Sequence, residues 1–210
     1  MEILIVGDEG QKEEFLSGIN DKNHLIFAAD LPSINDFKNY EAFFILSKLN
    51  SPVNFDLFEN KPVFINEVIK TSSALNYPKN MVRMNGWSGF IQRKTWEVVS
   101  NDMITTEKIA TQINRKIIAV KDEPGLVAAR VISMVINEAF FAIEEKISSR
   151  QEIDMAMKLG TNYPFGPFEW AEKIGIDNIY CLLEALSNND QRYLPSNELK
   201  KEFLEKSNFK

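Results

Sequence analysis

The stretch GDEGQKEEF, residues 7–15, directly follows a strand-like run, EILIV, at residues 2–6. Where a strand turns into a helix that holds a dinucleotide, glycines in the spacing G-x-G-x-x-G let the backbone approach the pyrophosphate at the helix N-terminus. Here Gly7 takes the first of these positions, but Glu9 takes the second and Lys12 the third. The turn therefore keeps one of the three glycines that this chemistry uses.

The charge of the same turn also opposes phosphate binding. Glu9 puts a carboxylate where a pyrophosphate would lie, with Asp8 and Glu13 close by, and acids in a first helical turn stabilise a helix that holds no anion. One residue favours a dinucleotide. Asp30 ends the second predicted strand, 23 residues after Gly7, at the spacing of the acid that binds the ribose hydroxyls. Gly7 and Asp30 are therefore the candidate NAD-binding residues, in a turn whose acids argue against NAD binding of ordinary affinity.

The elements that would position these residues follow from the spacing of apolar residues. Short β-rich runs, read as buried strands, lie at residues 2–6, 24–29, 42–47, 62–68, 96–99 and 116–120. Segments 11–20 and 106–114 indicate helices, and the connections after residues 42–47 are short, so we expect fewer crossover helices than usual. This alternation predicts a Rossmann-like α/β domain at residues 1–119 with a mainly parallel sheet.

The chain changes character after residue 120, where the pattern becomes almost wholly helical and predicts an all-α domain at residues 120–210. The expected helix starts are Asp122, the capping box Ser149 to Glu152, Pro167, Asp177 and Ser196, and the expected stops are Gly160 and Gly175. Residues 126–143 are apolar around most of the circumference of their helix. Because such a helix is buried on several sides, we expect a homodimer through this domain.

Composition bounds the class of protein. A formal net charge of −6 over 210 residues argues against nucleic acid and anionic membranes as partners. The single cysteine, Cys181, permits no intramolecular disulfide and, with one histidine, no usual transition-metal cluster. The first residues do not look like a signal peptide, and no apolar run reaches the roughly 18 residues of a membrane span. We expect a cytoplasmic protein without a metal ion.

Residues 121–175 resemble the C-terminal domain of the 3-hydroxyacyl-CoA dehydrogenases. The matching segments are KDEPG (121–125), INEAF (136–140) and IDMAMKLGTNYPFGPFEWAEKIG (153–175). The resemblance implies a Rossmann-like nucleotide domain, here shorter than is usual in the family, and a helical domain that supplies the dimer contact and one wall of the acyl-CoA cleft. Turn chemistry alone explains the third segment as a helical corner, because Pro167 can begin a helix after a turn at Gly166.

The same resemblance assigns candidate catalytic residues. Family members pass a hydride from the 3-hydroxyl carbon to NAD and the hydroxyl proton to a histidine, which a glutamate partners. Matching that glutamate to Glu97 in WEVV puts Asn85, twelve residues earlier, at the position of the histidine. Unlike an imidazole, a carboxamide cannot accept a proton, and losing a general base costs roughly 10²–10⁴-fold in rate. Asn85 could still hydrogen-bond a substrate oxygen.

Other positions that the family uses are changed as well. The asparagine of the histidine motif falls on Ser88, and a second family asparagine falls on Ala129. The segment KTSSAL, residues 70–75, resembles the family's serine-rich loop, in which Ser72 or Ser73 could contact the substrate hydroxyl. A helix cap or a surface loop explains the same serines equally well.

Two functions stay open on this sequence. The first is a diverged, catalytically impaired member of the family that acts as a dimeric acyl-CoA-binding or partner-binding protein. The second is an active NAD-dependent 3-hydroxyacyl-CoA dehydrogenase, for example one acting on 3-hydroxybutyryl-CoA, in which Glu97 serves as the base directly or through water. A third, a non-redox reaction on an acyl-CoA or a small acid, is specified by no residue of the chain.

Overall fold

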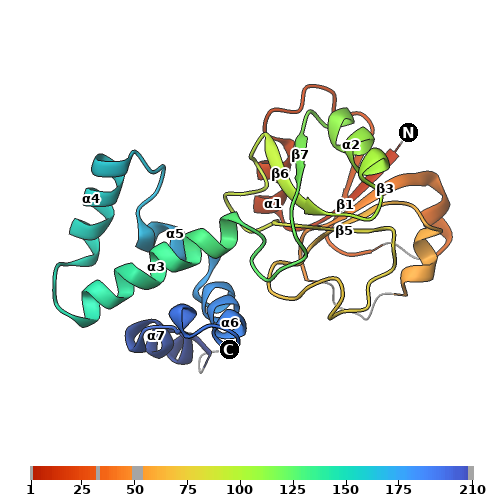
Figure 1. Cartoon of the computed structure of the whole chain (residues 1–210). Helices are drawn as coiled ribbons and strands as arrows, with labels where there is room; N and C mark the ends of the chain where they lie inside the picture. The colour runs from red at the N-terminus through yellow and green to blue at the C-terminus, as the bar shows by residue number, and fades with distance from the viewer. Residues whose placement is uncertain (1, 32–33, 49–53, 208–210) are drawn as a thin grey trace. The chain divides into compact units, whose positions relative to one another are not determined.

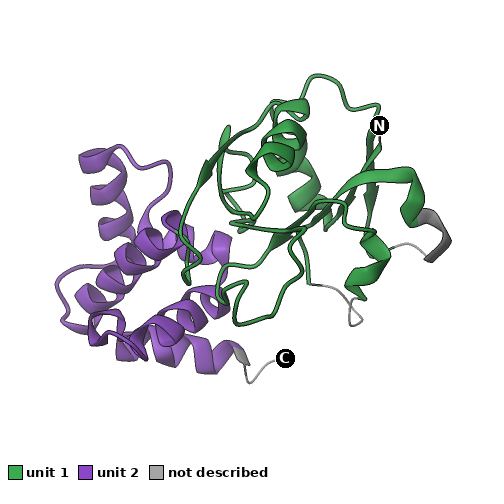
Figure 2. Ribbon diagram, turned by 45° about the vertical axis from the view of Figure 1, so that its right-hand side comes forward, with its two compact units in different colours: residues 1–126 green, residues 127–210 purple. Residues whose placement is uncertain are grey.

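A computed structural model describes residues 2–31, 34–48 and 54–207. The chain divides into two compact units, residues 1–126 and 127–210, which Figure 2 shows in different colours. Within the described residues, no helix is both long enough and apolar enough to cross a membrane.

The first unit is built on one sheet. Its strands, within the described residues, are β1 (Glu2–Val6), β2 (Leu25–Ala28), β3 (Tyr40–Ile45), β4 (Val63–Asn66), β5 (Met81–Met84), β6 (Thr95–Val99) and β7 (Lys116–Ala119) (Figure 1). The strand order is β2-β1-β3-β4-β5-β6-β7, and every neighbouring pair is parallel except β5 and β6. The prediction of a Rossmann-like, mainly parallel sheet is confirmed.

The six strands expected from the sequence are present, with ends shifted by at most two residues. Strand β5 was not predicted. Its sequence, MVRM, is interrupted by Arg83, yet all four residues are buried. A charged residue in a short apolar run hides a strand from pattern reading, because the partners that neutralise it come from elsewhere in the chain.

Two helices cover one face of the sheet. They are α1 (Glu9–Leu16) and α2 (Met103–Gln112), and the buried residues beneath them form one hydrophobic cluster. Phe15 of α1 packs edge-to-face on Phe44 with ring centroids 5.0 Å apart, and Phe44 stacks on Phe64 at 4.3 Å. Aromatic packing of this kind buries large apolar areas and adds its own pairwise attraction, so it fixes α1 firmly on the sheet.

The other face has a thinner cover. The 3-10 helices η1 (Ile34–Asn39) and η2 (Phe55–Phe58) contribute Phe37 and Phe58, which pack against Phe43 of the sheet. The described residues between β3 and β5 contain η2 but no α-helix, in agreement with the short connections expected there.

The second unit contains only helices in its described part. They are α3 (Ala128–Glu144), α4 (Arg150–Thr161), α5 (Pro167–Ile174), α6 (Ile176–Ser187), the 3-10 helix η3 (Gln191–Tyr193) and α7 (Asn197–Ser207). The long α3 contacts α4, α5, α6 and α7 (Figure 1). Phe140 of α3 packs edge-to-face on Phe168 of α5 at 5.1 Å, and Tyr180 of α6 stacks on Phe203 of α7 at 4.2 Å. The core of this unit is therefore built around α3.

Several helix ends lie where the local sequence predicts them. The Ser149 and Glu152 side chains form the expected capping box at the start of α4. Pro167 is the first residue of α5, and Gly175 ends that helix with a φ of 94°. These ends are set by hydrogen bonds and backbone preferences within a few residues, which a sequence displays directly.

Three predicted ends were wrong. Helix α4 continues through Gly160 to Thr161 and ends at Asn162, which adopts the left-handed conformation. Asp177 lies in the first turn of α6 and is not its cap. Asp122 does not begin a helix, because α3 starts at Ala128 and the Asp122 carboxylate binds groups of the first unit.

The long motif of residues 153–175 forms the predicted helical corner between α4 and α5. The Phe168 N–H donates to Asp154 Oδ1 at 2.8 Å, and the Gly166 N–H donates to Glu169 Oε2 at 2.9 Å. Lys158 forms an ion pair with Glu169. A Cβ atom at Gly166 would overlap the Asp154 carboxylate, so the motif residues hold one another in place.

We expect Gly166→Ala to lower the free energy of unfolding by about 1–3 kcal/mol, because the new methyl group must displace Asp154. Gly160→Ala is the matched control. Gly160 lies inside α4, and a Cβ atom added there would have no neighbour within 4 Å, so alanine should stabilise that helix by about 0.5–1 kcal/mol. Urea denaturation of both variants checks this, and equal effects would contradict the packing of the corner.

Candidate functional site

Four parallel strands of the first unit, β1, β3, β4 and β5, end at the same edge of the sheet. Gly7 follows β1, Asn66 ends β4 and Asn85 follows β5, while Asp30 lies two residues beyond the end of β2. Open α/β folds bind ligands at this carboxyl edge, where the strand order reverses, which here falls between β1 and β3. The structure thus brings three sequence-predicted residues, Gly7, Asp30 and Asn85, to one edge.

Asn85 is 4% exposed and is oriented by its own loop. Its Oδ1 accepts a hydrogen bond from the Trp87 backbone N–H at 3.2 Å. Because a backbone amide can only donate, this bond identifies the oxygen and leaves Nδ2 pointing elsewhere. Nδ2 is buried without a hydrogen-bond partner among the protein atoms described. A buried donor left unpaired costs about 1–3 kcal/mol, so Asn85 is suited to receive an acceptor such as a carbonyl oxygen.

Glu97 lies on β6, which pairs with β5, the strand that Asn85 follows. These strands are antiparallel, with Arg83 opposite Val99 and Met84 opposite Val98. Asn85 directly follows β5, and the same register extended by one residue would bring it level with Glu97, where paired side chains share one face of a sheet. The strand pair β5 and β6 thus carries both predicted catalytic positions, with a carboxamide and a carboxylate as the chemical groups.

The half-buried carboxylate of Glu97 also acts on an arginine of the preceding loop. Burial lowers the pKa of Arg93, and the negative charge of Glu97 opposes that effect. Glu97 therefore provides a negative field at this side of the sheet.

Gly7 and Asp30 occupy the positions that a dinucleotide site would use. The Gly7 N–H continues the sheet by donating to the Ala28 carbonyl at 3.1 Å. Asp30 Oδ1 accepts the Leu31 N–H at 2.8 Å. Both residues thus stand where the fold would bring the pyrophosphate and the ribose of NAD, the cofactor that the family implies.

The N-terminus of α1 does not fit a pyrophosphate. Asp8 is its N-cap, and Asp8 Oδ1 accepts the Gln11 N–H at 2.8 Å. In return Gln11 Oε1 accepts the Asp8 N–H at 3.0 Å, which completes a capping box. Two of the backbone amides that would meet a phosphate, those of Asp8 and Gln11, are thus bound to side chains at this helix end, one of them an acid.

A buried arginine ties the segment before unit 2 to the sheet. Arg83 is fully buried, and its Nε donates to the Glu67 carbonyl at 2.8 Å. Its other nitrogens bind the Asp122 carboxylate and the Glu123 carbonyl. Burial lowers the pKa of Arg83, and Asp122 opposes this by pairing with the charge. These partners come from two separate segments, so one guanidinium holds β5, the end of β4 and residues 122–123 together.

Asp122 is the counter-charge of this cluster. Its two oxygens accept the Ser72 and Ser73 N–H groups at 3.0 and 3.2 Å. Partial burial by itself raises the pKa of Asp122, but these amides and Arg83 outweigh it and lower the pKa below its usual value. The amides of Ser72 and Ser73 thus bind Asp122 and stabilise their own loop.

Tyr77 lies near the same cluster, and burial together with the charge of Glu67 raises its pKa to about 12.

Some residues at this edge of the sheet were not predicted from the sequence to belong to the site. Asp8 and Gln11 carry the spacing of a capping box, which was a readable signal. Asn66 and Arg83 gave no such signal, because their partners lie 16 to 40 residues away in the chain. Ser88, where the family has asparagine, hydrogen-bonds Glu14 of α1 at 2.8 Å.

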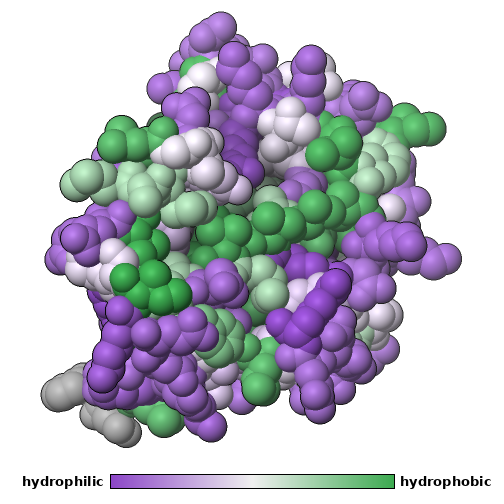
Figure 3. Space-filling view, turned by 60° about the vertical axis from the view of Figure 1, so that its left-hand side comes forward, coloured by the Kyte–Doolittle hydropathy of each residue, from purple (hydrophilic) through white to green (hydrophobic). Residues whose placement is uncertain are grey.

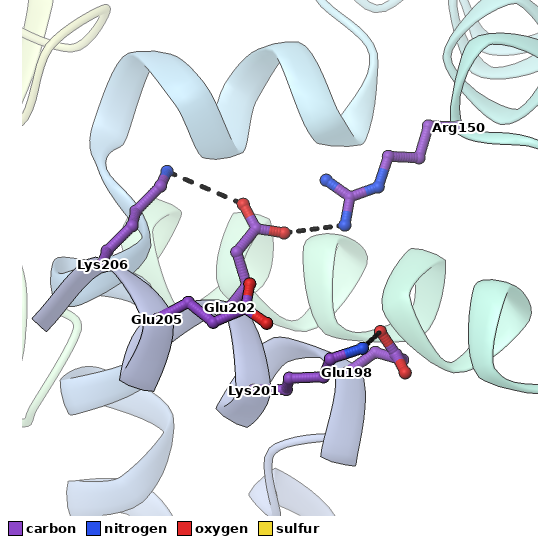
Figure 4. A pocket seen from close by; sticks show the side chains of 6 residues that line it. All are labelled: Arg150, Glu198, Lys201, Glu202, Glu205 and Lys206. Atoms are coloured by element: carbon purple, nitrogen blue, oxygen red, sulfur yellow. Dashed lines mark hydrogen bonds and ion pairs between the residues drawn. The ribbon is translucent and has the colours of Figure 1, made fainter. Parts of the chain in front are cut away.

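A hollow of about 460 Å³ lies in the second unit (Figure 4). It is lined by charged residues of α7 and the start of α4, namely Arg150, Glu198, Lys201, Glu202, Glu205 and Lys206. Arg150 pairs with Glu202 at 2.7 Å and also stacks over the rings of Phe140 and Phe168. Lys206 adds a second cation 3.6 Å from Glu202. These charges neutralise one another, so the hollow is a place where charged residues of α7 and the start of α4 pair with each other.

Among the residues that the structure describes, no group of His, Cys, Asp and Glu side chains could hold a metal ion.

The sheet order and the site at its carboxyl edge define a Rossmann-like α/β protein. Residues 125–210 match a family model described as 3-hydroxyacyl-CoA dehydrogenase, C-terminal domain. The 3-hydroxyadipyl-CoA dehydrogenase of Escherichia coli (strain K12) is 31% identical over 140 residues, which cover 65% of this chain and 30% of that protein. A probable 3-hydroxybutyryl-CoA dehydrogenase of Bacillus subtilis (strain 168) is 29% identical over 143 residues, covering 64% of this chain and 50% of that protein.

A solved structure supports the fold over nearly the whole length. The (S)-3-hydroxybutyryl-CoA dehydrogenase from Ralstonia eutropha aligns with a TM-score of 0.68 at 21% identity, covering 95% of this chain and 92% of that one. Together with the matching family model, these similarities show that the chain belongs to the 3-hydroxyacyl-CoA dehydrogenase family. The chain spans half or less of the length of the two curated relatives.

We expect Asp122→Asn to lower the free energy of unfolding by about 3 kcal/mol at neutral pH, because Arg83 stays buried without its counter-charge. The folded pKa of Asp122 is lowered, so its stabilisation is present above the unfolded pKa and is lost as pH falls through the folded one. The difference between wild type and Asp122→Asn should therefore shrink below about pH 4.

Denaturant titrations at several pH values measure this difference. Asp21→Asn is the control, since Asp21 lies on an exposed turn and its replacement should change stability by less than about 0.5 kcal/mol. A pH-independent cost of Asp122→Asn would contradict the role given to its charge.

Proposed function

We propose that this protein binds a CoA thioester as a homodimer and is catalytically impaired in hydride transfer. The observation that carries the proposal is Asn85, at the end of β5, whose Nδ2 is buried and has no partner among the described atoms. A carboxamide N–H can hold a carbonyl oxygen in one orientation. It cannot take the proton that oxidation of a hydroxyl group releases.

The ligand class comes from the relatives. Two of them are named for 3-hydroxyadipyl-CoA and 3-hydroxybutyryl-CoA, which are CoA thioesters with an oxygen on carbon 3. A 3-oxoacyl thioester offers the carbonyl oxygen that Asn85 Nδ2 lacks as a partner. We therefore propose acetoacetyl-CoA, the smallest such thioester, as the probe of this site.

The alternative is an active NAD-dependent 3-hydroxyacyl-CoA dehydrogenase with an altered site. The retained carboxylate of Glu97, on the strand that pairs with β5, favours it, as does Asp30 near the end of β2. In that case Glu97 takes the proton directly or through water. Without the histidine we expect a rate roughly 10²–10⁴-fold below that of a dehydrogenase with its general base.

The homodimer is proposed from apolar residues that unit 2 leaves exposed. Val127, the N-cap of α3, and Val131, one turn further on, are each 53% exposed, and Leu159 of α4 is 82% exposed. Helix α4 has no buried residue among those described. Figure 3 shows hydrophobic side chains gathered in a band on one face of the molecule. Exposed apolar surface of this kind is typical of a protein interface.

We also propose a cytoplasmic location, because the chain has a single cysteine.

We expect calorimetry to show saturable binding of acetoacetyl-CoA to the wild type, and Asn85→Leu, which keeps the size but cannot donate, to weaken it about tenfold or more. Asn101→Leu, at an exposed asparagine, is the control and should bind like the wild type. Asn85→His should not restore NADH-dependent reduction, because the turn at α1 is separately altered.

Two outcomes would contradict the proposal. Turnover of acetoacetyl-CoA by the wild type at the rate of an intact dehydrogenase would establish the alternative. Absence of acetoacetyl-CoA binding to folded wild type would remove the proposed ligand class.

We expect light scattering at micromolar concentration to show a dimer, and Val131→Glu to produce a monomer, because a charge on the exposed face of α3 would be buried in the interface. Ile104→Glu is the matched control. Ile104 is 85% exposed on α2 of the first unit, so the same substitution there should leave the dimer intact. A monomeric wild type would refute the proposed dimer.

A further inference from the structure

The Gln11 side chain bridges the point where the strand order reverses. Its Nε2 donates to the Leu46 carbonyl at 2.9 Å. Gln11 belongs to α1, which follows β1, and Leu46 is the first residue after β3. The bond therefore crosses between the ends of β1 and β3, the crevice in which such folds hold a ligand.

Gly7 makes room for this bridge. A Cβ atom added at Gly7 would lie 2.9 Å from Gln11 Oε1, closer than real contacts allow. In a dinucleotide site, the missing side chain of this glycine lets the pyrophosphate approach the backbone. In this protein the space next to Gly7 is filled by the Gln11 side chain.

Asn66 extends the same hydrogen-bonded chain along the edge. Its Nδ2 donates to the Leu46 carbonyl at 2.8 Å, and its Oδ1 accepts the Gly86 N–H at 3.0 Å. A Cβ at Gly86 would lie 2.7 Å from the Asn66 side chain, so this contact also depends on a glycine. Protein groups thus satisfy one another across the ends of β1, β3, β4 and β5.

Glu14 connects α1 to the loop after Asn85. Its carboxylate accepts the Ser88 hydroxyl at 2.8 Å, and the Gly89 N–H bonds to both of its oxygens at 2.8 and 2.7 Å. Gly89 has a φ of 88°, a conformation that glycine adopts readily. A carboxylate on two such donors forms charge-assisted hydrogen bonds, so α1 also fixes the loop that begins at Asn85.

We infer that the N-terminus of helix α1 itself fills this crevice, so that Asp8 and Gln11 close the dinucleotide site of the fold. The Asp8 and Gln11 amides are capped, the space at Gly7 is taken, and the Asp8 carboxylate repels a pyrophosphate, while Glu9 is paired with Lys12. The family's cofactor therefore does not fit these residues. The helix instead holds the edge of the sheet and, through Glu14, the loop after Asn85.

A titration with NADH tests the closure, with energy transfer from Trp87 and Trp96 of the first unit as the signal. We expect no saturation of the wild type up to about 1 mM. The double variant Asp8→Ala/Gln11→Ala removes the cap and the bridge together. Its binding of NADH should saturate at a concentration at least tenfold below the highest one tested with the wild type. Gln11→Ala alone is the milder variant if the double substitution unfolds the protein, which circular dichroism reports.

Glu13→Gln is the matched control, because it removes one exposed negative charge from α1 without touching the cap or the bridge. It should bind NADH no better than the wild type. Saturable binding by the wild type in the micromolar range would overturn the inference. So would equal binding by the control and the opened variants, or a folded double variant that binds no better than the wild type.

Closure of the crevice and the proposed function rest on different residues, so each can fail without the other. Wild type that binds NADH while Asn85 still blocks turnover would end the closure and leave the impaired enzyme. Wild type that binds neither NADH nor acetoacetyl-CoA would support the closure and end the proposed ligand class.

Discussion

The first unit depends on one buried charge. Arg83 lies in the middle of β5, and its guanidinium joins the end of β4 to the segment that precedes unit 2, through Glu67, Asp122 and Glu123. A charge with no exposure to water is tolerated only where hydrogen bonds and a counter-charge replace the water, and these partners supply both. The position of Asn85, two residues beyond Arg83, follows from this arrangement.

Most of the polar groups described at the carboxyl edge of the sheet form hydrogen bonds with one another. The Gln11 and Asn66 side chains both donate to the Leu46 carbonyl, and Glu14 accepts from Ser88 and Gly89. Asn85 Nδ2 differs, because it is buried and has no partner among the described atoms. Buried donors without a partner are uncommon in proteins, and each calls for an explanation. The recognition of an acceptor at Asn85, as proposed above, therefore rests on this one unpaired donor.

Prediction from the sequence succeeded where neighbouring residues decide the outcome and failed where distant ones do. Apolar runs revealed six strands, but β5 was missed because the neutralising partners of Arg83 lie 16 to 40 residues away. Asp122 has the chemistry of a helix cap, and its local sequence favours one. Arg83 and the amides of Ser72 and Ser73 offer the carboxylate stronger hydrogen bonds, so tertiary contacts override the local preference.

By itself, the sequence determined the alternating elements of the first unit, the capping box at Ser149, the helix start at Pro167 and the family motif of residues 153–175. These features depend on backbone preferences and on hydrogen bonds that span a few residues. Only the tertiary structure decided that β5 pairs antiparallel with β6 and that Gln11 reaches Leu46, since strand register and crevice contacts join residues far apart in the chain. Long-range pairing is selected by packing and by the satisfaction of buried polar groups, which depend on the whole fold.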